Sequence, residues 1–338
     1  MLTQLMPSIE AKKALGFRIP QRYLRYLKIF LASRGYFRNW FSVGLRYFLY
    51  NRGLLEVRFL DVRCKDGSVL VLSPRLYGLL LNGLFNGLFK DLNCKDGVAV
   101  VRDFAIPFQE LLASEDVFDA LRHGWRYDRG HGCWFKDDVK FKHMRYYITE
   151  VFDYGEYRDV DVSGKTVVDI GAGYGETAVY FLKKGAKHIM AVEPCPHVYR
   201  EMLDNLKLNG VENRVTPINA AISSTHSSIS VECPNGKATA DTITLEDIIK
   251  KNPNVCGGVL KMDCEGCEYD IIPHSYEHVK VFDEVYFEYH AYITGMPIDL
   301  LLKKLSRDFA CRIISDDEFY RRHGFNKRLL GLIKCVKK

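Results

Sequence analysis

Two groups of glycines and acidic residues have the types and spacing that a chemical binding site requires. The first lies in the segment VVDIGAGYGE, residues 167–176, where an apolar run reaches Asp169 and three glycines follow at alternate positions. The second lies in LKMDCEGCE, residues 260–268, where another apolar run ends in Asp263. Glycines let a backbone approach a ligand closely, and carboxylates accept hydrogen bonds or a proton. The spacing of these residues decides which ligand they suit.

The glycine loop differs from a dinucleotide-binding loop. Such loops follow the pattern G-x-G-x-x-G, in which the helix N-terminus binds a pyrophosphate. Here the pattern is D-x-G-x-G-x-G, and Glu176 takes the place of the third glycine. A carboxylate at a helix start repels pyrophosphate but attracts a ligand with a sulfonium and an ammonium group. Glu193 ends the next apolar run, where a carboxylate can accept hydrogen bonds from two ribose hydroxyls.

Together these residues predict a site for S-adenosylmethionine. We expect the ribose on Glu193, the methionine portion over the glycine loop and the positive groups near Asp169. The alternative is a glycine-rich turn between a strand and a helix that binds no ligand.

Five acid–base groups are expected at the same edge of the sheet as the glycine loop. They are Asp263, Glu265, Glu268, Glu288 and His290. A hydroxyl that accepts a methyl group must lose its proton, so a base within hydrogen-bond reach is reasonable. We predict His290, Asp263 and Glu265 as the catalytic residues, with a neutral imidazole near pH 7. The alternatives are that Asp263 and Glu268 only bind backbone amides, and that His290 is a core residue.

The ten cysteines are spread over the whole length of the chain. In a chain of 338 residues this scatter predicts no disulfide framework and favours a reducing cytosol. Cys264 and Cys267 are spaced as a metal or redox pair, but one such pair is weak evidence. We therefore expect no metal site.

Beyond Val160 the sequence alternates between strands and helices. Strands are predicted at KTVVDIG, AKHIMAVEP, NRVTPINAAIS, GGVLKMDCEG and KVFDEVYFEYH, and helices at ETAVYFLKKG, HVYREMLDNLKLNG and TLEDIIKKN. This alternation predicts an α/β fold with a parallel sheet and helices on both faces. In the residues before it, helices are expected up to residue 53 and over 104–123. Hairpin-like turns are expected over 55–72, 93–101 and 124–141.

The segments VVDIGAGYGETAVYFLKKGAKHIMAVEPCP and LKMDCEGCEYDII resemble those of FkbM-type S-adenosylmethionine-dependent methyltransferases. The resemblance extends over residues 145–290, and the Asp-x-Glu-Gly-x-Glu motif starting at Asp263 is its most specific part. It implies a Rossmann-like seven-stranded methyltransferase sheet, S-adenosyl-L-methionine as cofactor and methylation of a hydroxyl on a sugar or natural product. It assigns cofactor binding to Asp169, Gly171, Ala172, Gly173, Glu193, Pro194, Asn219 and Ala220. The Asp263 loop and His290 would face the acceptor.

Three parts of the chain are therefore predicted. They are a basic, aromatic helical arm over residues 1–53, a β-rich cap over 54–150 and the methyltransferase domain over 151–338. The formal net charge is +6, yet residues 11–55 contain ten basic residues and no acidic one. The arm could be a solvated basic face, could lie on an anionic membrane through residues 11–52, or could bind nucleic acid. No RNA-binding module is recognisable, so the last interpretation is the weakest.

The composition, 47% hydrophobic and 27% charged, is that of an ordinary globular protein. No run of 18 apolar residues exists, so no transmembrane helix is expected. We expect a cytoplasmic methyltransferase that could also contact the inner membrane face. Its acceptor is predicted to be a glycan, a glycolipid or a related small hydroxyl compound, without an obligate protein partner. The alternatives are an RNA methyltransferase and a protein that binds the cofactor without catalysis.

Overall fold

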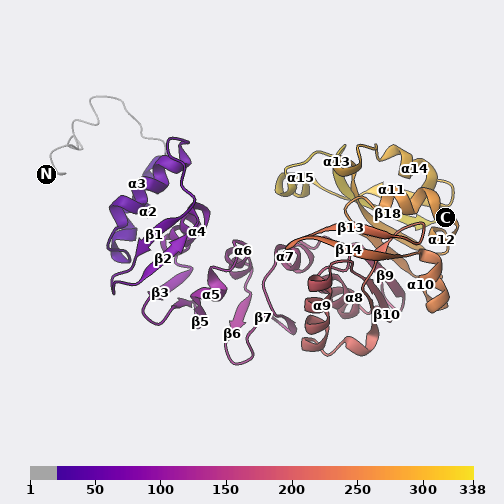
Figure 1. The fold of residues 1–338 in the computed structure, drawn as a ribbon, viewed down its shortest axis with the longest axis horizontal. Coiled ribbons are helices and arrows are strands. Elements are labelled where there is room, and N and C mark those ends of the chain that lie inside the picture. The colour runs from indigo at the N-terminus through magenta and orange to yellow at the C-terminus, as the bar shows by residue number, and fades with distance from the viewer. Residues whose placement is uncertain (1–20) are drawn as a thin grey trace. The chain divides into compact units, whose positions relative to one another are not determined.

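The computed structural model describes residues 21–338, which divide into two compact units between His131 and Gly132 (Figure 1). Residues 1–20, the first part of the predicted basic arm, lie outside the described residues. The strand-and-helix alternation predicted after Val160 falls wholly in the second unit. Within residues 21–338, no helix combines the length and the apolar character needed to cross a bilayer.

The N-terminal unit begins with helices, as predicted. They are α2 (Gln21–Ala32), the short 3-10 helix η1 (Ser33–Gly35) and α3 (Trp40–Asn51), and α4 (Pro74–Phe85) follows later. The predicted hairpin over 55–72 is confirmed, because β1 (Leu60–Arg63) pairs antiparallel with β2 (Val69–Leu72). Helix α4 is absent from the sequence-based predictions, although Ser73 caps its first turn and a proline begins it, as is common at helix starts.

A three-stranded antiparallel sheet follows in the same unit. It contains β3 (Phe89–Asn93), β4 (Val98–Val101) and β5 (Phe104–Pro107). The turn predicted over 93–101 is confirmed, whereas the helix predicted over 104–123 is wrong at its start, where β5 pairs with β4. Pro107 lacks a backbone N–H and therefore destabilises a helix interior, and the helix begins only after it. The remaining elements are α5 (Phe108–Leu111), α6 (Asp116–Arg122) and β6 (Arg126–Asp128).

The C-terminal unit is built on a seven-stranded sheet in the order β11-β10-β9-β15-β16-β18-β17. Its strands are β9 (Thr166–Ile170), β10 (His188–Val192), β11 (Val215–Ile218), β15 (Val259–Met262), β16 (Glu284–His290), β17 (Phe309–Ile313) and β18 (Leu330–Lys337). The strands from β11 to β16 are parallel, and β18 runs antiparallel to β16 and β17. The predicted α/β class with a Rossmann-like seven-stranded sheet is confirmed.

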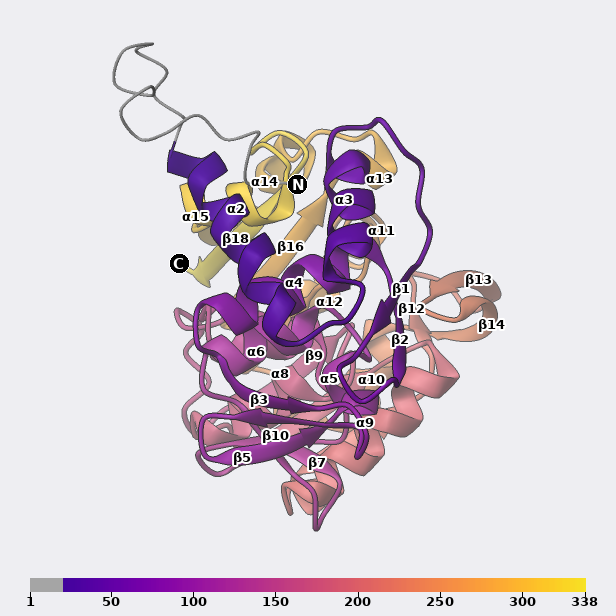
Figure 2. The ribbon, with the colours of Figure 1, turned by 90° about the vertical axis from the view of Figure 1, so that its left-hand side faces the viewer.

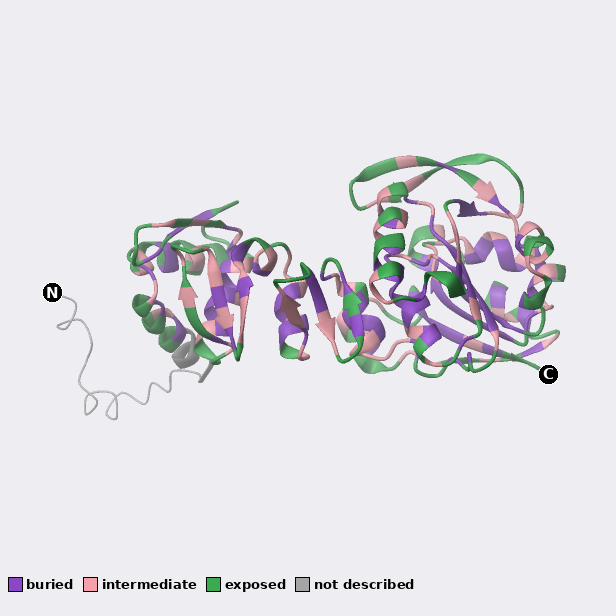
Figure 3. Ribbon diagram, turned by 90° about the horizontal axis from the view of Figure 1, so that it is seen from below, coloured by how far each residue is buried: buried purple, intermediate pink, exposed green. Residues whose placement is uncertain are grey.

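Helices cover this sheet and bury its central strands. They include α7 (Tyr146–Phe152), α8 (Glu176–Lys183), α9 (Pro196–Leu208), α10 (Leu245–Lys251), α11 (Glu268–His274), α12 (Tyr276–Val279), α13 (Ala291–Thr294), α14 (Asp299–Leu305) and α15 (Asp317–His323). Every residue of β9, β15 and β16 is buried, as the continuous purple strands of Figure 3 show. Strands covered on both faces need unbroken apolar runs, which is the pattern seen in the sequence.

Two smaller sheet elements complete this unit. β7 (Cys133–Lys136) pairs with β8 (Val139–Phe141), which confirms that part of the hairpin predicted over 124–141. β13 (Ser228–Cys233) and β14 (Gly236–Ile243) form a mostly exposed hairpin that stands out from the main sheet (Figure 2), and β12 (Ala221–Ile222) pairs with its second strand.

The expectation that the cysteines form no disulfide framework is wrong. Eight cysteines form four disulfides: Cys64–Cys94, Cys195–Cys233, Cys264–Cys267 and Cys311–Cys335. The two cysteines of each pair are at most 38 positions apart in the chain. Strands and loops bring them together, and the even spread of cysteines along the sequence does not reveal this. The inference of a reducing compartment rested on unpaired cysteines and loses that support.

These pairs can be tested chemically. Tryptic digestion without reduction should yield three disulfide-linked peptide pairs and one peptide that contains the Cys264–Cys267 bond internally, because paired sulfurs do not react with an alkylating agent. The exposed Cys256 is the internal control and should be alkylated without prior reduction. Full alkylation of Cys64 or Cys311 in the native, unreduced protein would contradict the pairing.

Candidate active site

The glycine loop joins the end of β9 to the start of α8. Gly171, Gly173 and Gly175 have φ values of +74°, +53° and +88°, which side chains other than glycine rarely allow. A Cβ at Gly171 would lie 1.7 Å from the carbonyl oxygen of Asp263. A Cβ at Gly173 would lie 2.6 Å from Oε1 of Glu176. The glycine loop, called the glycine cradle below, is therefore packed directly against the Asp263 loop and leaves no room for a side chain at Gly171 or Gly173.

Asp169 is fully buried beneath this loop, and both of its oxygens are engaged. Oδ2 accepts a hydrogen bond of 2.5 Å from the Thr177 hydroxyl, and Oδ1 lies 3.0 Å from Nζ of Lys261. Nζ of Lys261 also donates to the carbonyl oxygen of Gly171 at 2.7 Å. Burial lowers the pKa of Lys261, but the charges of Asp169 and Asp263 outweigh burial and raise it. Asp169 and Lys261 thus form a buried ion pair that holds the loop in place.

Lys261 is the main site residue that sequence reasoning missed. It stands in the middle of the buried run VLKM, where its side chain is only 1% exposed. A lysine in a fully buried strand needs a partner of opposite charge. Lys261 is the one cation in this apolar run, and its strand pairs with the strand that carries Asp169. A lysine in such a run could therefore have indicated a buried ion pair.

Glu193 follows β10 and reaches back to the same loop. Its Oε2 accepts from the backbone N–H of Gly173 at 3.1 Å, and its Oε1 accepts from that of Cys195 at 2.8 Å. Burial raises the pKa of Glu193 to about 7 despite these hydrogen bonds. Each carboxylate oxygen has a second lone pair, so Glu193 can still accept from hydroxyl donors.

Asn219 lies beside Glu193, and Ala220, which follows it, is buried in the hydrophobic core. The Asn219 side-chain amide donates to the carbonyl oxygen of Glu193 at 2.8 Å and to that of Pro194 at 3.3 Å. The backbone N–H of Glu193 donates to Ile218 at 3.0 Å, which ties the ends of β10 and β11 together. Ala172, in the glycine loop, is buried and donates to the carbonyl oxygen of Val192 at 3.0 Å. Hydrogen bonds and the buried ion pair therefore link seven of the eight residues assigned to cofactor binding, all but Ala220, around the ends of β9 and β10.

Glu176 has an unusual position under the cradle. It is 5% exposed, and its Oε2 has no hydrogen-bond partner among the described residues. Burial raises the pKa of Glu176 to about 8. A buried carboxylate next to a bare backbone suits a ligand that brings positive charge. The residues present therefore fit S-adenosylmethionine, whose sulfonium and ammonium groups supply that charge.

The loop after β15 carries the second group of acids. The backbone N–H of Asp263 donates to Ile170 at 3.0 Å, and Tyr157 donates its hydroxyl to Oδ2 of Asp263 at 3.2 Å. Glu265 has a φ of +54°, which is rare for a residue with a side chain, and its carboxylate is exposed. Such conformations are concentrated at functional loops. Glu268, at the start of α11, is fully buried and accepts from the backbone N–H of Gly266 at 3.1 Å.

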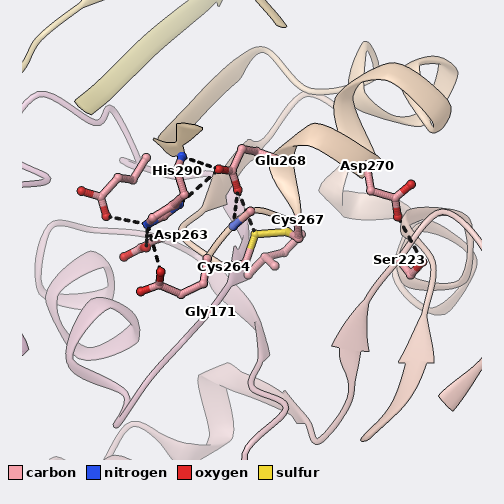
Figure 4. Close-up of a disulfide and its surroundings, with 12 residues drawn as sticks. Gly171, Ser223, Asp263, Cys264, Cys267, Glu268, Asp270 and His290 are labelled. Carbon is pink, nitrogen blue, oxygen red and sulfur yellow. Dashed lines mark hydrogen bonds and ion pairs between the residues drawn. A yellow bond between two sulfur atoms is a disulfide. The ribbon is translucent and has the colours of Figure 1, made fainter. Parts of the chain in front are cut away.

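His290 is surrounded by four carboxylates (Figure 4). Its Nδ1 lies 3.1 Å from Glu268, and its Nε2 lies 3.4 Å from Glu288 and 3.7 Å from both Asp263 and Glu265. Burial alone lowers the pKa of His290, but the hydrogen bonds and charges of Glu268 and Glu288 raise it well above 6.5. The imidazole is therefore a cation at neutral pH, which differs from the neutral imidazole expected from the sequence.

Glu288 stands out among these acids, although the sequence analysis assigned it no role. It is 8% exposed, and its Oε1 has no hydrogen-bond partner among the described residues. Burial and the charge of Asp263 raise the pKa of Glu288 to about 7. Side-chain atoms of Asp263, Glu288 and His290 lie within 4.8 Å of one another, close enough to share a cation. The expectation of no metal site stays a prediction.

The disulfide between Cys264 and Cys267 closes the Asp263–Glu268 loop (Figure 4). The sulfur of Cys264 lies 3.7 Å from Oε2 of Glu268. The prediction that Glu268 binds backbone amides is confirmed by its bonds to Gly266 and His290. The loop is thus fixed by a covalent link and a buried carboxylate together.

The seven-stranded sheet, with its glycine loop after β9, is a Rossmann-like fold. Residues 169–300 match the family described as "Methyltransferase FkbM domain". The resemblance found in the sequence is confirmed over these residues.

Three individual proteins give the scale of the similarity. The ribosomal protein L11 methyltransferase of Alteromonas mediterranea is 41% identical over 56 residues, 17% of this chain and only 19% of the relative. The methyltransferase FkbM of Methylobacillus flagellatus KT is 17% identical, with a TM-score of 0.40 over 56% of this chain and 48% of the other. M. capricolum TrmK, solved with S-adenosyl-homocysteine, is 13% identical, with a TM-score of 0.34 over 58% of this chain and 69% of the other.

The buried ion pair under the glycine loop yields a prediction. Lys261→Met leaves the Asp169 carboxylate buried without its cation, so the free energy of unfolding should fall by about 3–5 kcal/mol. Chemical denaturation measures this change. Lys251→Met, at an exposed position on α10, is the matched control and should change stability by less than about 0.5 kcal/mol. Equal stability of the two variants would show that the pair does not hold the loop.

Proposed function

We propose that this protein is an S-adenosylmethionine-dependent methyltransferase that methylates a hydroxyl group. The observation that carries the proposal is the contact between the two loops. The glycine cradle that suits the cofactor touches the carbonyl oxygen of Asp263, and the acid–base cluster follows directly from that residue. A methyl donor over the first loop and an acceptor at the second would therefore be adjacent.

In this proposal the residues of the first loop bind and orient the cofactor. Glu193 accepts from the ribose hydroxyls, Asn219 and Ala220 border the adenine, and Gly171 and Gly173 let the methionine portion lie against the backbone. Glu176 balances the positive charge of the ligand. Asp169 acts through Lys261 as a positioning residue, because both of its oxygens are already engaged.

The bound cofactor would supply an activated methyl group, so alignment of the acceptor provides much of the rate. The chain's own residues would remove the proton of the acceptor hydroxyl. Glu288 is the best-tuned base of the cluster, because its pKa of about 7 lies near the working pH. The His290 cation holds Glu288, Asp263 and Glu265 together and stabilises their charges. His290 would then be a positioning residue, with Asp263 and Glu265 facing the acceptor.

The acceptor class follows from the family resemblance and from the open side of the cluster. The side chain of Glu265 is 65% exposed, and an ionised carboxylate only accepts hydrogen bonds. Glu265 would therefore bind a hydroxyl group of the methyl-accepting substrate. This favours a polyhydroxyl compound such as a glycan or the sugar of a glycolipid. Incubation with labelled cofactor and fractionated cell extract tests it, with label expected in glycan or lipid. Label in RNA or protein would overturn the acceptor class.

Cofactor binding can be tested by calorimetric titration with S-adenosylhomocysteine. Glu193→Ala leaves ribose donors unpaired in a buried site, so binding should weaken by about 1–3 kcal/mol. Gly173→Val should abolish binding, because the new side chain would collide with the Glu176 carboxylate and the position requires a positive φ. Gly210→Ala, at a left-handed turn with open space around it, is the control for backbone strain and should bind normally. Binding of NAD instead of this ligand would refute the proposed cofactor.

The acid–base cluster predicts a pH dependence of methyl transfer. The raised pKa of Glu288 means that this carboxyl is protonated below about pH 7, so the rate should fall as the pH falls through 7. Glu288→Gln should lower the rate by about 10²–10⁴-fold and remove this limb of the profile. His290→Ala should also lower the rate while leaving the affinity for S-adenosylhomocysteine unchanged. An unaltered pH profile in Glu288→Gln would exclude it as the base.

A further inference from the structure

The N-terminal unit contains an apolar groove that the proposed function does not use. Helices α2, α3 and α4 enclose a cavity of about 720 Å³, within the range of about 300–1,000 Å³ typical of small-molecule sites. Its walls include Leu27, Phe30, Phe41, Leu45, Phe48 and Leu81. Asn51 and Arg52 stand in the lining as the polar groups, and the Arg52 guanidinium lies 5.3 Å from the ring of Phe48.

The rim of this groove is apolar and exposed to solvent. Leu27, Leu31, Phe41, Leu45 and Phe48 are each between 39% and 51% exposed. Such a gathering of large apolar side chains on one surface marks an interaction site, because water covers it unfavourably. The green segments on α2 and α3 in Figure 3 belong to this region.

The positive charge of the helices around the groove indicates which kind of ligand it could bind. Lys28, Arg34, Arg38, Arg46 and Arg52 are exposed on α2, α3 and the residues between them. No acidic residue occurs from residue 11 to residue 55. An apolar groove between three helices that carry cations and no acidic residue fits an amphiphile that has a hydrocarbon tail and an anionic head. A nucleic acid would use the cations but not a cavity lined by Leu and Phe side chains.

We propose that this groove receives the acyl chain of an anionic membrane phospholipid and docks the N-terminal unit on the membrane surface. The apolar rim of α2 and α3 would enter the boundary between head groups and chains. The surrounding Lys and Arg residues would face the phosphates. This inference is independent of the proposed methyl transfer, since it uses neither the glycine loop nor the acid–base cluster.

Trp40 allows a direct test in the full-length protein. Its ring lies 5.1 Å from that of Phe30 and 5.7 Å from that of Phe41, both in the groove lining. The other two tryptophans, Trp125 and Trp134, are at most 1% exposed and provide a constant background. Vesicles containing phosphatidylglycerol should shift the emission to the blue, and brominated acyl chains should quench it. Vesicles of phosphatidylcholine alone should do neither, and added salt should reverse the binding.

A matched pair of variants separates docking from misfolding. Leu45→Glu places a carboxylate on the groove rim and should weaken binding to phosphatidylglycerol vesicles at least tenfold. Leu203→Glu makes the same change at a 37% exposed position of α9 and should bind vesicles like the wild type. Both variants should keep the circular dichroism spectrum and the thermal unfolding midpoint of the wild type, which shows that the protein is folded.

Several results would overturn the proposal. Equal vesicle binding by the two variants would show that lipid does not use the groove. Absence of quenching of Trp40 by brominated chains would show that the rim does not enter the bilayer. If Leu45→Glu instead converted a dimer to a monomer in size-exclusion chromatography without changing vesicle binding, the groove would be a contact between two copies of the chain.

Discussion

The buried ion pair between Lys261 and Asp169 is the interaction on which the candidate site depends. One lysine neutralises the carboxylate at the end of β9 and also binds the carbonyl oxygen of Gly171. The ion pair thereby joins β9 and β15 at the end of β9. At this point Gly171, with its positive φ, turns the backbone out of the sheet. Since a buried charge without a partner is strongly unfavourable, neither residue can change alone. The position of the glycine loop is thus fixed by the ion pair and by the contact of Gly171 with Asp263.

A second charge arrangement fixes the acceptor side. His290 ends β16 and Asp263 follows β15, so neighbouring parallel strands bring the cation and its carboxylates together. Glu268 binds the backbone and the ring of His290 from the start of α11. The cluster carries more negative than positive charge, which explains why burial and mutual repulsion raise the pKa of Glu288. The same excess of negative charge suits a site next to a cationic cofactor.

Much of this arrangement could be predicted from the sequence because it depends on strand ends. An apolar run followed by Asp169 or Asp263 defines both a strand and the edge where its polar residue emerges, and parallel order brings such edges together. The sequence could not reveal that Asp169 points downward to Lys261, because a buried ion pair depends on side-chain direction across two strands. The raised pKa of His290 could not be predicted either, because it results from Glu268 at the start of α11 and Glu288 on β16, which only the fold brings together. The cysteine pairs escaped prediction for a similar reason: Cys311 and Cys335 meet only because β17 and β18 are adjacent.

The strand order has a consequence for biosynthesis. β16, which carries Glu288 and His290, lies between β15 and β18, and His290 is paired with Leu330 at the start of β18. During translation β16 leaves the ribosome well before β18, so one of its edges stays unpaired while the intervening helices and β17 are made. An apolar strand with an open edge can pair with another chain. Slow elongation over residues 291–329 would lengthen that exposure, whereas a chaperone bound to the nascent chain would protect the strand that completes the site.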